Sequence, residues 1–118
     1  MAAKDSVTIY HNPRCAKSRS ALELLRKKGI EPRIVEYLKT PPSAAELRGL
    51  LSKLGMKPAA LARTGEVEYK AKLKGKTLSD AQWIDALARD PILIERPIVV
   101  RGTRAVVGRP PEKILELL

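Results

Sequence analysis

The spacing of apolar residues in the first third of the chain predicts a strand, a helix and a second strand. Val7–Tyr10 is a short β-type run that predicts a buried strand. Ser18–Lys28 predicts an amphipathic helix that Gly29 ends, and Arg33–Tyr37 predicts the next strand. The inward-facing positions of this helix are Leu22, Leu24 and Leu25. Short connections make this a βαβ unit with parallel strands and a right-handed crossover.

Capping signals predict that the middle of the chain is helical. The sequence Ser-Ala-Ala-Glu from Ser43 is a capping box that opens a helix reaching about Leu54. A second capping signature begins at Ser79, ahead of a helix over Trp83–Ala88. Between them, Lys57-Pro58-Ala59 starts another short turn toward Arg63.

The last part of the chain predicts two strands and a helix. Arg96–Val100 is a strand opened by a proline, and Arg104–Val107 is the strand that follows a turn at Gly102. These two runs predict an antiparallel hairpin. Pro110-Pro111 in the first turn and the apolar run Leu115–Leu118 predict a final helix.

The order β-α-β, helices, β-β-α resembles that of a thioredoxin-like α/β fold with a mixed four-stranded sheet. We expect one domain over residues 1–118, with a helical insertion at about 43–95. In such a fold the nucleophile follows the first strand and lies at the start of the first helix. A proline before the third strand faces this nucleophile. These residues are Cys15 and Pro97, and the Arg96–Pro97 bond is expected to be cis by this analogy.

Cys15 is the only cysteine, and it lies between the first predicted strand and the first predicted helix. The positive end of the helix dipole and the basic side chains of Arg14, Lys17 and Arg19 favour its thiolate form. The alternative is an inert cysteine that fills space near the helix start. Ser18 stands three residues later, where a resolving cysteine would complete a redox pair. A redox cycle on Cys15 therefore needs an external thiol, most simply glutathione with glutaredoxin.

The amino-acid composition limits the kinds of partner that this protein is expected to bind. The chain has 23 Lys and Arg against 13 Asp and Glu, a formal charge of +10, so its surface attracts anions. It has no Phe, one Trp and three Tyr, which provides few stacking platforms, and no nucleic-acid partner is expected. One histidine and one cysteine do not form a metal-binding pattern, so no metal is expected. Met1–Asp5 does not resemble a secretory signal and no long apolar run is present, so we expect a cytoplasmic protein without a membrane partner.

Several separated motifs resemble the glutaredoxin-coupled arsenate reductase (ArsC) family of the thioredoxin-like superfamily. They agree in order and spacing, over a match from about Val7 to Leu118. The motifs are Tyr10–Cys15, Ser18–Arg19, Tyr37–Pro42, Leu61–Arg63, Pro91–Val100 and Gly108–Pro110. The stretch Cys-Ala-Lys-Ser-Arg from Cys15 is similar to the subgroup whose motif is Cys-Ser/Ala-Lys-Ser-Arg.

The resemblance implies an enzyme that reduces arsenate to arsenite through a thiolate nucleophile, Cys15. It implies that three arginines hold the oxyanion, and arginine suits this task because its fixed fork of donors bridges two oxygens. The matching arginines are Arg63, Arg96 and Arg109. It also implies no bound cofactor, glutathione as co-substrate and glutaredoxin as partner.

Two further residues near Cys15 have two interpretations each. His11 is the family's histidine before the nucleophile: it either helps the thiol to ionise when protonated or packs as a neutral ring at the end of the first strand. Ser18 either donates a hydrogen bond to the thiolate or caps the helix.

Two other functions compete with arsenate reduction. One is a glutathione-linked thiol reductase that uses the same cysteine on another oxyanion or on a protein mixed disulfide. The other is a non-enzymatic transcriptional regulator resembling Spx, which shares the fold and binds RNA polymerase. Spx-type proteins generally use a Cys-x-x-Cys switch, and Ser18 interrupts that pattern.

Overall fold

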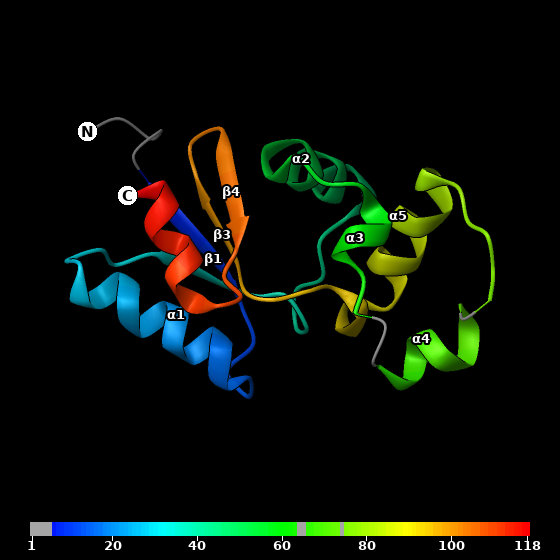
Figure 1. Ribbon diagram of the computed structural model, residues 1–118, viewed down its shortest axis with the longest axis horizontal. Coiled ribbons are helices and arrows are strands. Elements are labelled where there is room, and N and C mark those ends of the chain that lie inside the picture. The colour runs from blue at the N-terminus through cyan, green and yellow to red at the C-terminus, as the bar shows by residue number, and fades with distance from the viewer. Residues whose placement is uncertain (1–5, 64–65, 74) are drawn as a thin grey trace. The chain divides into compact units, whose positions relative to one another are not determined.

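The computed structural model describes residues 6–63, 66–73 and 75–118, which form two compact units (Figure 1). The first, here called the sheet unit, comprises the described residues up to Thr40 and those from Arg96 to Leu118. The second, the helical unit, comprises Pro41–Glu95. The expectation for Met1–Asp5 lies outside the described residues, and the single domain over 1–118 stays a prediction.

The sheet unit contains a mixed four-stranded sheet, as predicted. Its elements are β1 (Val7–His11), α1 (Ala16–Lys27), β2 (Arg33–Glu36), β3 (Ile98–Arg101), β4 (Arg104–Val107) and the 3-10 helix η3 (Pro111–Leu117). The strand order is β2-β1-β3-β4. β1 pairs parallel with β2 and antiparallel with β3, and β3 pairs antiparallel with β4. The predicted βαβ unit and C-terminal hairpin are therefore confirmed.

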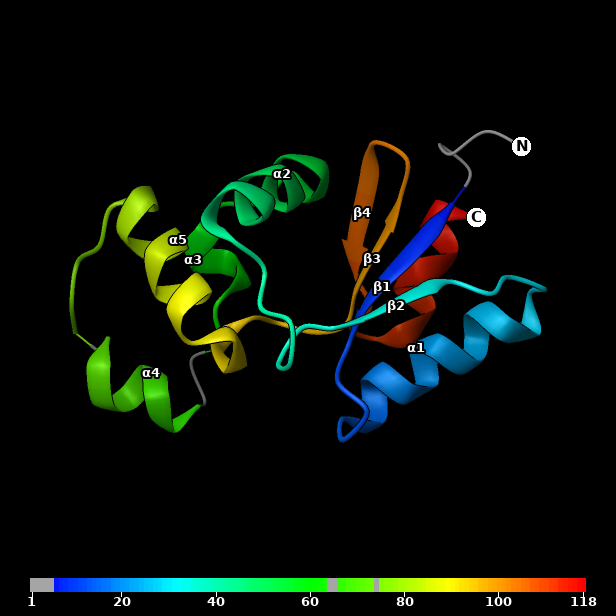
Figure 2. The same cartoon turned by 180° about the vertical axis from the view of Figure 1, so that it is seen from behind.

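Two helices cover one face of this sheet and bury its core. α1 and η3 lie side by side in both views (Figures 1 and 2). The core between them and the strands consists of Val7, Ile9, Ala21, Leu25, Val99, Ile114 and Leu117. Leu25 is fully buried, and Leu22 and Leu24 pack against the core as half-buried residues. The predicted apolar face of the first helix is confirmed.

Two helices begin earlier than expected, and the last helix is of another type. The helix expected over Trp83–Ala88 spans Asp80–Arg89. α1 begins at Ala16, two residues before the predicted start, because Cys15 itself takes the extended conformation of an N-cap, with φ −95° and ψ 122°. Gly29 ends the helix in the left-handed region with φ +79°, where a side chain would be strained. The predicted C-terminal helix is a 3-10 helix over Pro111–Leu117.

The helical unit consists of short helices, two of which start at capping serines. They are α2 (Ala44–Leu54), α3 (Pro58–Leu61), α4 (Val67–Lys72), α5 (Asp80–Arg89) and the 3-10 helix η2 (Pro91–Leu93). The Ser43 hydroxyl accepts a hydrogen bond from the Glu46 amide at 3.1 Å. Ser79 and Gln82 exchange both bonds of a capping box at the start of α5. The sequence interpretation missed α4, which has no cap of this kind.

A backbone bridge holds the residues around Arg63 in the helical unit. The Arg63 amide donates to the Leu93 carbonyl at 2.7 Å, and the Glu95 amide donates to the Leu61 carbonyl at 2.8 Å. The chain therefore places Arg63 beside the segment that leads into Arg96 along the sequence. None of the helices in the described part of the chain has the length and hydrophobicity needed to cross a membrane.

Candidate active site

The strand register gathers several predicted site residues at one end of the sheet. Tyr10 pairs with Ile98, which pairs with Val107. Beyond these pairs the Gly108 amide donates to the Pro97 carbonyl at 2.8 Å. Three chain segments therefore meet at this end of the sheet. They are His11 and Asn12 at the end of β1, Arg96 and Pro97 before β3, and Gly108 and Arg109 after β4. Pro97 is buried, and the Arg96–Pro97 peptide is cis, as predicted.

Hydrogen bonds hold the short loop that carries Cys15. The Cys15 amide donates to the Asn12 carbonyl, and the Arg14 amide donates to Asn12 Oδ1, both at 3.0 Å. Arg19 Nη1 donates to the Pro13 carbonyl at 2.8 Å. Cys15 is a free, half-buried thiol at the N-cap of α1, and its side chain makes no capping bond. The loop is thus ordered while the thiol stays partly accessible to a small reactant.

His11 and Ser18 are brought together beneath this loop. Both are buried, and His11 Nδ1 lies 2.6 Å from Ser18 Oγ. The Asn12 amide also donates to Ser18 Oγ, at 3.0 Å. Ser18 is the third residue of α1 and therefore not its N-cap. The predicted capping role in its usual form is wrong, because Cys15 occupies that position and Ser18 instead ties α1 to the end of β1.

Burial determines the charge state of His11. The residue is 6% exposed, and the loss of solvation lowers its pKa. Glu36 raises that pKa, whereas Arg19 and Arg26 lower it further. The net lowering from the ordinary value of 6.5 favours a neutral ring at neutral pH. Of the two interpretations of His11, the geometry favours the neutral ring that packs at the end of the first strand.

A neutral His11 limits what the Ser18 hydroxyl does. The contact between Nδ1 and Oγ needs one proton, which either the hydroxyl or the ring supplies. With the hydroxyl as donor, Nδ1 accepts and the Ser18 proton is fully used by His11. With the ring as donor, the Ser18 proton is left for another acceptor. The hydrogen-bond donation from Ser18 to the Cys15 thiolate therefore depends on the tautomer of His11.

The Arg96 side chain presents buried hydrogen-bond donors. Its Nε and Nη1 atoms are buried and form no hydrogen bond with the described residues. A guanidinium keeps its charge at any working pH, so these N–H groups stay charged donors. An unsatisfied buried donor costs about 1–3 kcal/mol, more when charged. The Arg96 side chain thus keeps two buried, charged donors without a hydrogen bond in the described part of the chain.

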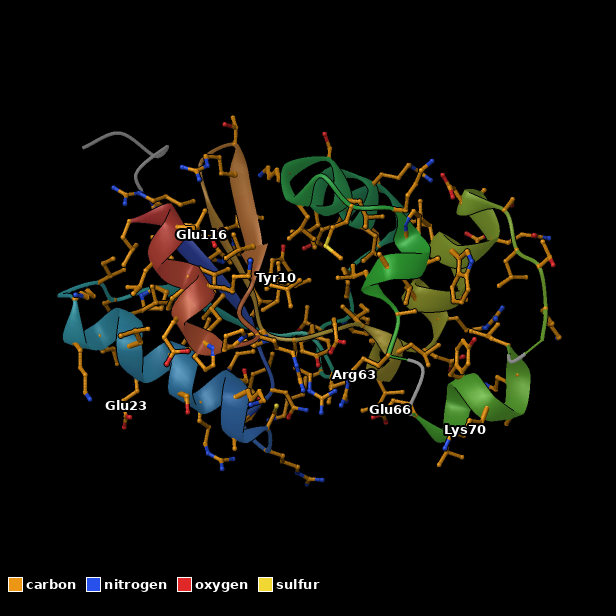
Figure 3. The ribbon with its side chains drawn as sticks, viewed as in Figure 1. Tyr10, Glu23, Arg63, Glu66, Lys70 and Glu116 are labelled. Atoms are coloured by element: carbon orange, nitrogen blue, oxygen red, sulfur yellow. The ribbon has the colours of Figure 1, made fainter. Side chains whose placement is uncertain are left out.

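The other two predicted arginines lie in different surroundings. Arg109 follows β4 at the same end of the sheet as Arg96 and is half-buried. Arg63 belongs to the helical unit, where its Nη1 lies 2.8 Å from Glu66 Oε2 and its Nε lies 3.4 Å from Glu95 Oε1. Figure 3 shows the side chains of Arg63 and Glu66 next to one another. That Arg63 shares a site with Cys15 stays a prediction.

Sequence reasoning overlooked Asn12 as a residue of this site. Asn12 is 6% exposed, and its amide, carbonyl and side-chain oxygen all make hydrogen bonds in the Cys15 loop. The Asn-Pro pair was a usable signal, because asparagine favours turns by bonding the backbone two residues on. Within the described ranges, no group of three or more His, Cys, Asp or Glu side chains is arranged to hold a metal ion.

Comparisons with known proteins agree with this fold. The family model named ArsC family matches residues 10–117. The uncharacterized protein YfgD of Escherichia coli (strain K12) is 51% identical over 114 residues, covering 95% of this chain and 96% of that protein. An arsenate reductase of Haemophilus influenzae is 46% identical over 115 residues, covering 96% and 99%. The solved structure of an arsenate reductase from Vibrio cholerae has a TM-score of 0.92 and 49% identity, covering 96% and 98%. The chain belongs to the ArsC family and has its thioredoxin-like fold.

Proposed function

We propose that this protein is an arsenate reductase in which Cys15 is the nucleophile, glutathione the co-substrate and glutaredoxin the final reductant. The relatives named arsenate reductase support the reaction class. The observation that carries the proposal is the pair of buried, unpaired N–H donors of Arg96 at the sheet end where β1 leads into the Cys15 loop. A tetrahedral oxyanion is a ligand that meets this need, because it offers several acceptor oxygens and negative charge.

The first step forms a bond between sulfur and arsenic. The Cys15 thiolate attacks arsenate, and one arsenate oxygen takes up a proton and leaves as water. Arsenic stays in the +5 state, and the product is an anionic thioester of arsenate. Arg96 and Arg109 stabilise the charge on its oxygens, together with the first backbone N–H groups of α1, which have no partner within the helix.

The second step transfers two electrons to arsenic. Glutathione loses its thiol proton to an oxygen on arsenic, and its sulfur bonds to the sulfur of Cys15. The bond between sulfur and arsenic breaks, and its electron pair stays on arsenic. Arsenite in the +3 state leaves, and Cys15 remains as a mixed disulfide with glutathione. A glutaredoxin thiolate then attacks the glutathione sulfur and releases the Cys15 thiolate. Two thiols thus supply the two electrons, which the single cysteine of this chain cannot do alone.

These thiol partners imply a reducing compartment. Glutathione and glutaredoxin keep thiols reduced in the cytosol, so the proposal places the protein there.

A coupled assay of arsenate reduction with glutathione and glutaredoxin tests the proposal. Wild type is compared with Cys15→Ser and Arg96→Ala, and with Arg33→Ala as a matched control, because Arg33 is an exposed arginine on β2. We expect Cys15→Ser to be inactive, Arg96→Ala to lose about 10²-fold or more in kcat/KM for arsenate, and Arg33→Ala to match wild type.

Two outcomes would assign a different function to the protein. Wild type that turns over no faster than Cys15→Ser, yet reduces a glutathionylated model protein or another oxyanion, is a thiol reductase of a different substrate. Wild type without any thiol-dependent turnover, but with affinity for RNA polymerase, is a regulator.

A further inference from the structure

A groove next to Cys15 is not used by the chemistry described so far. It lies within the sheet unit between the exposed side of α1 and the start of η3, with a volume of about 440 Å³. This volume falls within the range of small-molecule sites, about 300–1,000 Å³. Leu24 and Pro111 provide apolar lining, and four charged side chains complete it: Lys17, Glu23, Lys27 and Glu112. The groove is therefore amphipathic, with both signs of charge.

These four charges are available to a ligand. All four residues are exposed, and none of them forms an ion pair or side-chain hydrogen bond within the part of the chain that the structure describes. Glu23 and Lys27 are four residues apart on α1, a spacing that often supports an ion pair, yet their charged groups do not meet. The Glu23 carboxylate and the Lys27 ammonium therefore lie on the same face of α1 without an ion pair among the described residues.

The groove begins beside the nucleophile. Ala16, the residue after Cys15, lines it, and the lining continues along α1 as far as Lys27. From Lys17 to Lys27 the helix rises about 15 Å, at about 1.5 Å per residue. A tripeptide, at most about 10 Å long when extended, fits along this stretch with one end near Cys15. Long lysine side chains bridge the remaining distance.

We propose that this groove is the binding site of the thiol co-substrate, a zwitterionic tripeptide thiol of the glutathione type. The inference rests on the proposed function, because it names the site of its second reactant. Glutathione carries one ammonium and two carboxylates, and the groove carries two carboxylates and two ammonium groups. Glu23 and Lys27 complement the amino-acid head of the γ-glutamyl residue, which carries both charges on one carbon. Lys17 complements the carboxylate of the glycine residue, which is the carboxylate nearer to the thiol along the tripeptide.

Binding in this groove would orient the sulfur of glutathione for its attack on Cys15. Bound in this way, the thiol of glutathione points to the end of the groove where Cys15 stands. Its sulfur forms the disulfide bond with Cys15 as the bond to arsenic breaks, and the electron pair goes to arsenic. Holding the two sulfurs together replaces an encounter in solution with a reaction within a complex.

Steady-state kinetics with two thiols test the site. Lys27→Gln and Glu23→Gln are compared with Lys53→Gln, an exposed lysine in the last turn of α2. We expect KM for glutathione to rise by up to about fivefold in each groove variant, the upper end of the range for exposed charge pairs, and not in Lys53→Gln. With 2-mercaptoethanol as the thiol, which carries no charge, turnover by all three variants should equal that of wild type. A double variant that exchanges Glu23 and Lys27 should recover part of the loss.

A binding measurement separates this inference from the proposed reaction. S-methylglutathione, which has no free thiol, is titrated into the Cys15→Ser protein and followed by amide chemical shifts. We expect shifts in α1 and η3, with weaker binding after Lys27→Gln. Shifts elsewhere, no binding, or groove variants that match Lys53→Gln in both measurements would overturn the site while leaving arsenate reduction intact. Binding in the groove without arsenate turnover would instead contradict the proposed substrate.

Discussion

His11 shows how burial changes the role that a residue type suggests. A histidine near a cysteine suggests a proton donor or a source of positive charge. In this protein the ring is buried against Ser18, and desolvation lowers its pKa, with Arg19 and Arg26 acting in the same direction against Glu36. The neutral ring joins the end of β1 to α1 through Ser18. Its contribution is to hold the Cys15 loop in place.

The lowered pKa of His11 predicts a pH-dependent stability. The unfolded chain binds this proton at a higher pH than the folded chain, so protonation favours unfolding. The contribution is fully present above the ordinary pKa of 6.5 and is lost as the pH falls toward the lowered pKa of the folded state. Urea unfolding at pH 7.5 and 5.5 measures it. His11→Gln should lose less stability over this interval than wild type, and an equal loss in both proteins would contradict the prediction.

Arg96 predicts a specific requirement for a guanidinium. Arg96→Lys keeps the positive charge but removes the planar fork and the buried Nε donor. We expect kcat/KM for arsenate to fall about 10²-fold, the usual effect of losing a preorganised donor. Arg33→Lys on the exposed part of β2 is the conservative control and should behave as wild type. Full activity in Arg96→Lys would show that charge alone is sufficient.

At the scale of elements, the site depends on how closely β4 approaches the residue before β3. A Cβ on Gly108 would lie 3.1 Å from Pro97 Cγ and 3.2 Å from Ile114 Cγ2. The same glycine donates its amide to the Pro97 carbonyl. Gly108 therefore lets β4, η3 and the segment that carries Arg96 pack together, since any side chain would push them apart.

Two glycine substitutions with opposite expected effects test this packing. Gly108→Ala should lower the free energy of unfolding by about 1–3 kcal/mol, because overpacking forces the backbone to shift. Gly49→Ala, in α2 with open space at its Cβ, should raise it by about 0.5–1 kcal/mol through helix propensity. Thermal and urea unfolding of both variants measures the difference. Equal effects of the two substitutions would show that the contact with Pro97 is loose.

The residues at which helices and strands begin or end were the most predictable part of the fold. The Ser43 and Ser79 caps, the stop at Gly29 and the hairpin from Arg104 follow from residues within a few positions of each other. The start of α1 was placed two residues late because Cys15 is an uncommon N-cap residue whose side chain gives no capping bond. α4 was missed because its start lacks a capping residue.

At the scale of the whole molecule, the formal charge of +10 favours anionic reactants at Cys15. Cys15 is the only cysteine, so alkylation reports this thiol alone. Anionic iodoacetate should react faster with Cys15, relative to neutral iodoacetamide, than it does with a free thiol. Raising the salt concentration to about 1 M shortens the Debye length to about 3 Å and should remove most of this preference. A ratio that does not depend on salt would contradict an electrostatic origin.

The sequence by itself determined the order of strands and helices and the position of Cys15 at the start of a helix, because these depend on spacing and caps over a few residues. Only the tertiary structure decided which distant residues meet. The pairing of Tyr10 with Ile98 brings Arg96 to the end of β1, where its donors are buried, and burial lowers the pKa of His11. Burial and register arise from contacts between residues far apart in the chain, so local patterns do not contain them.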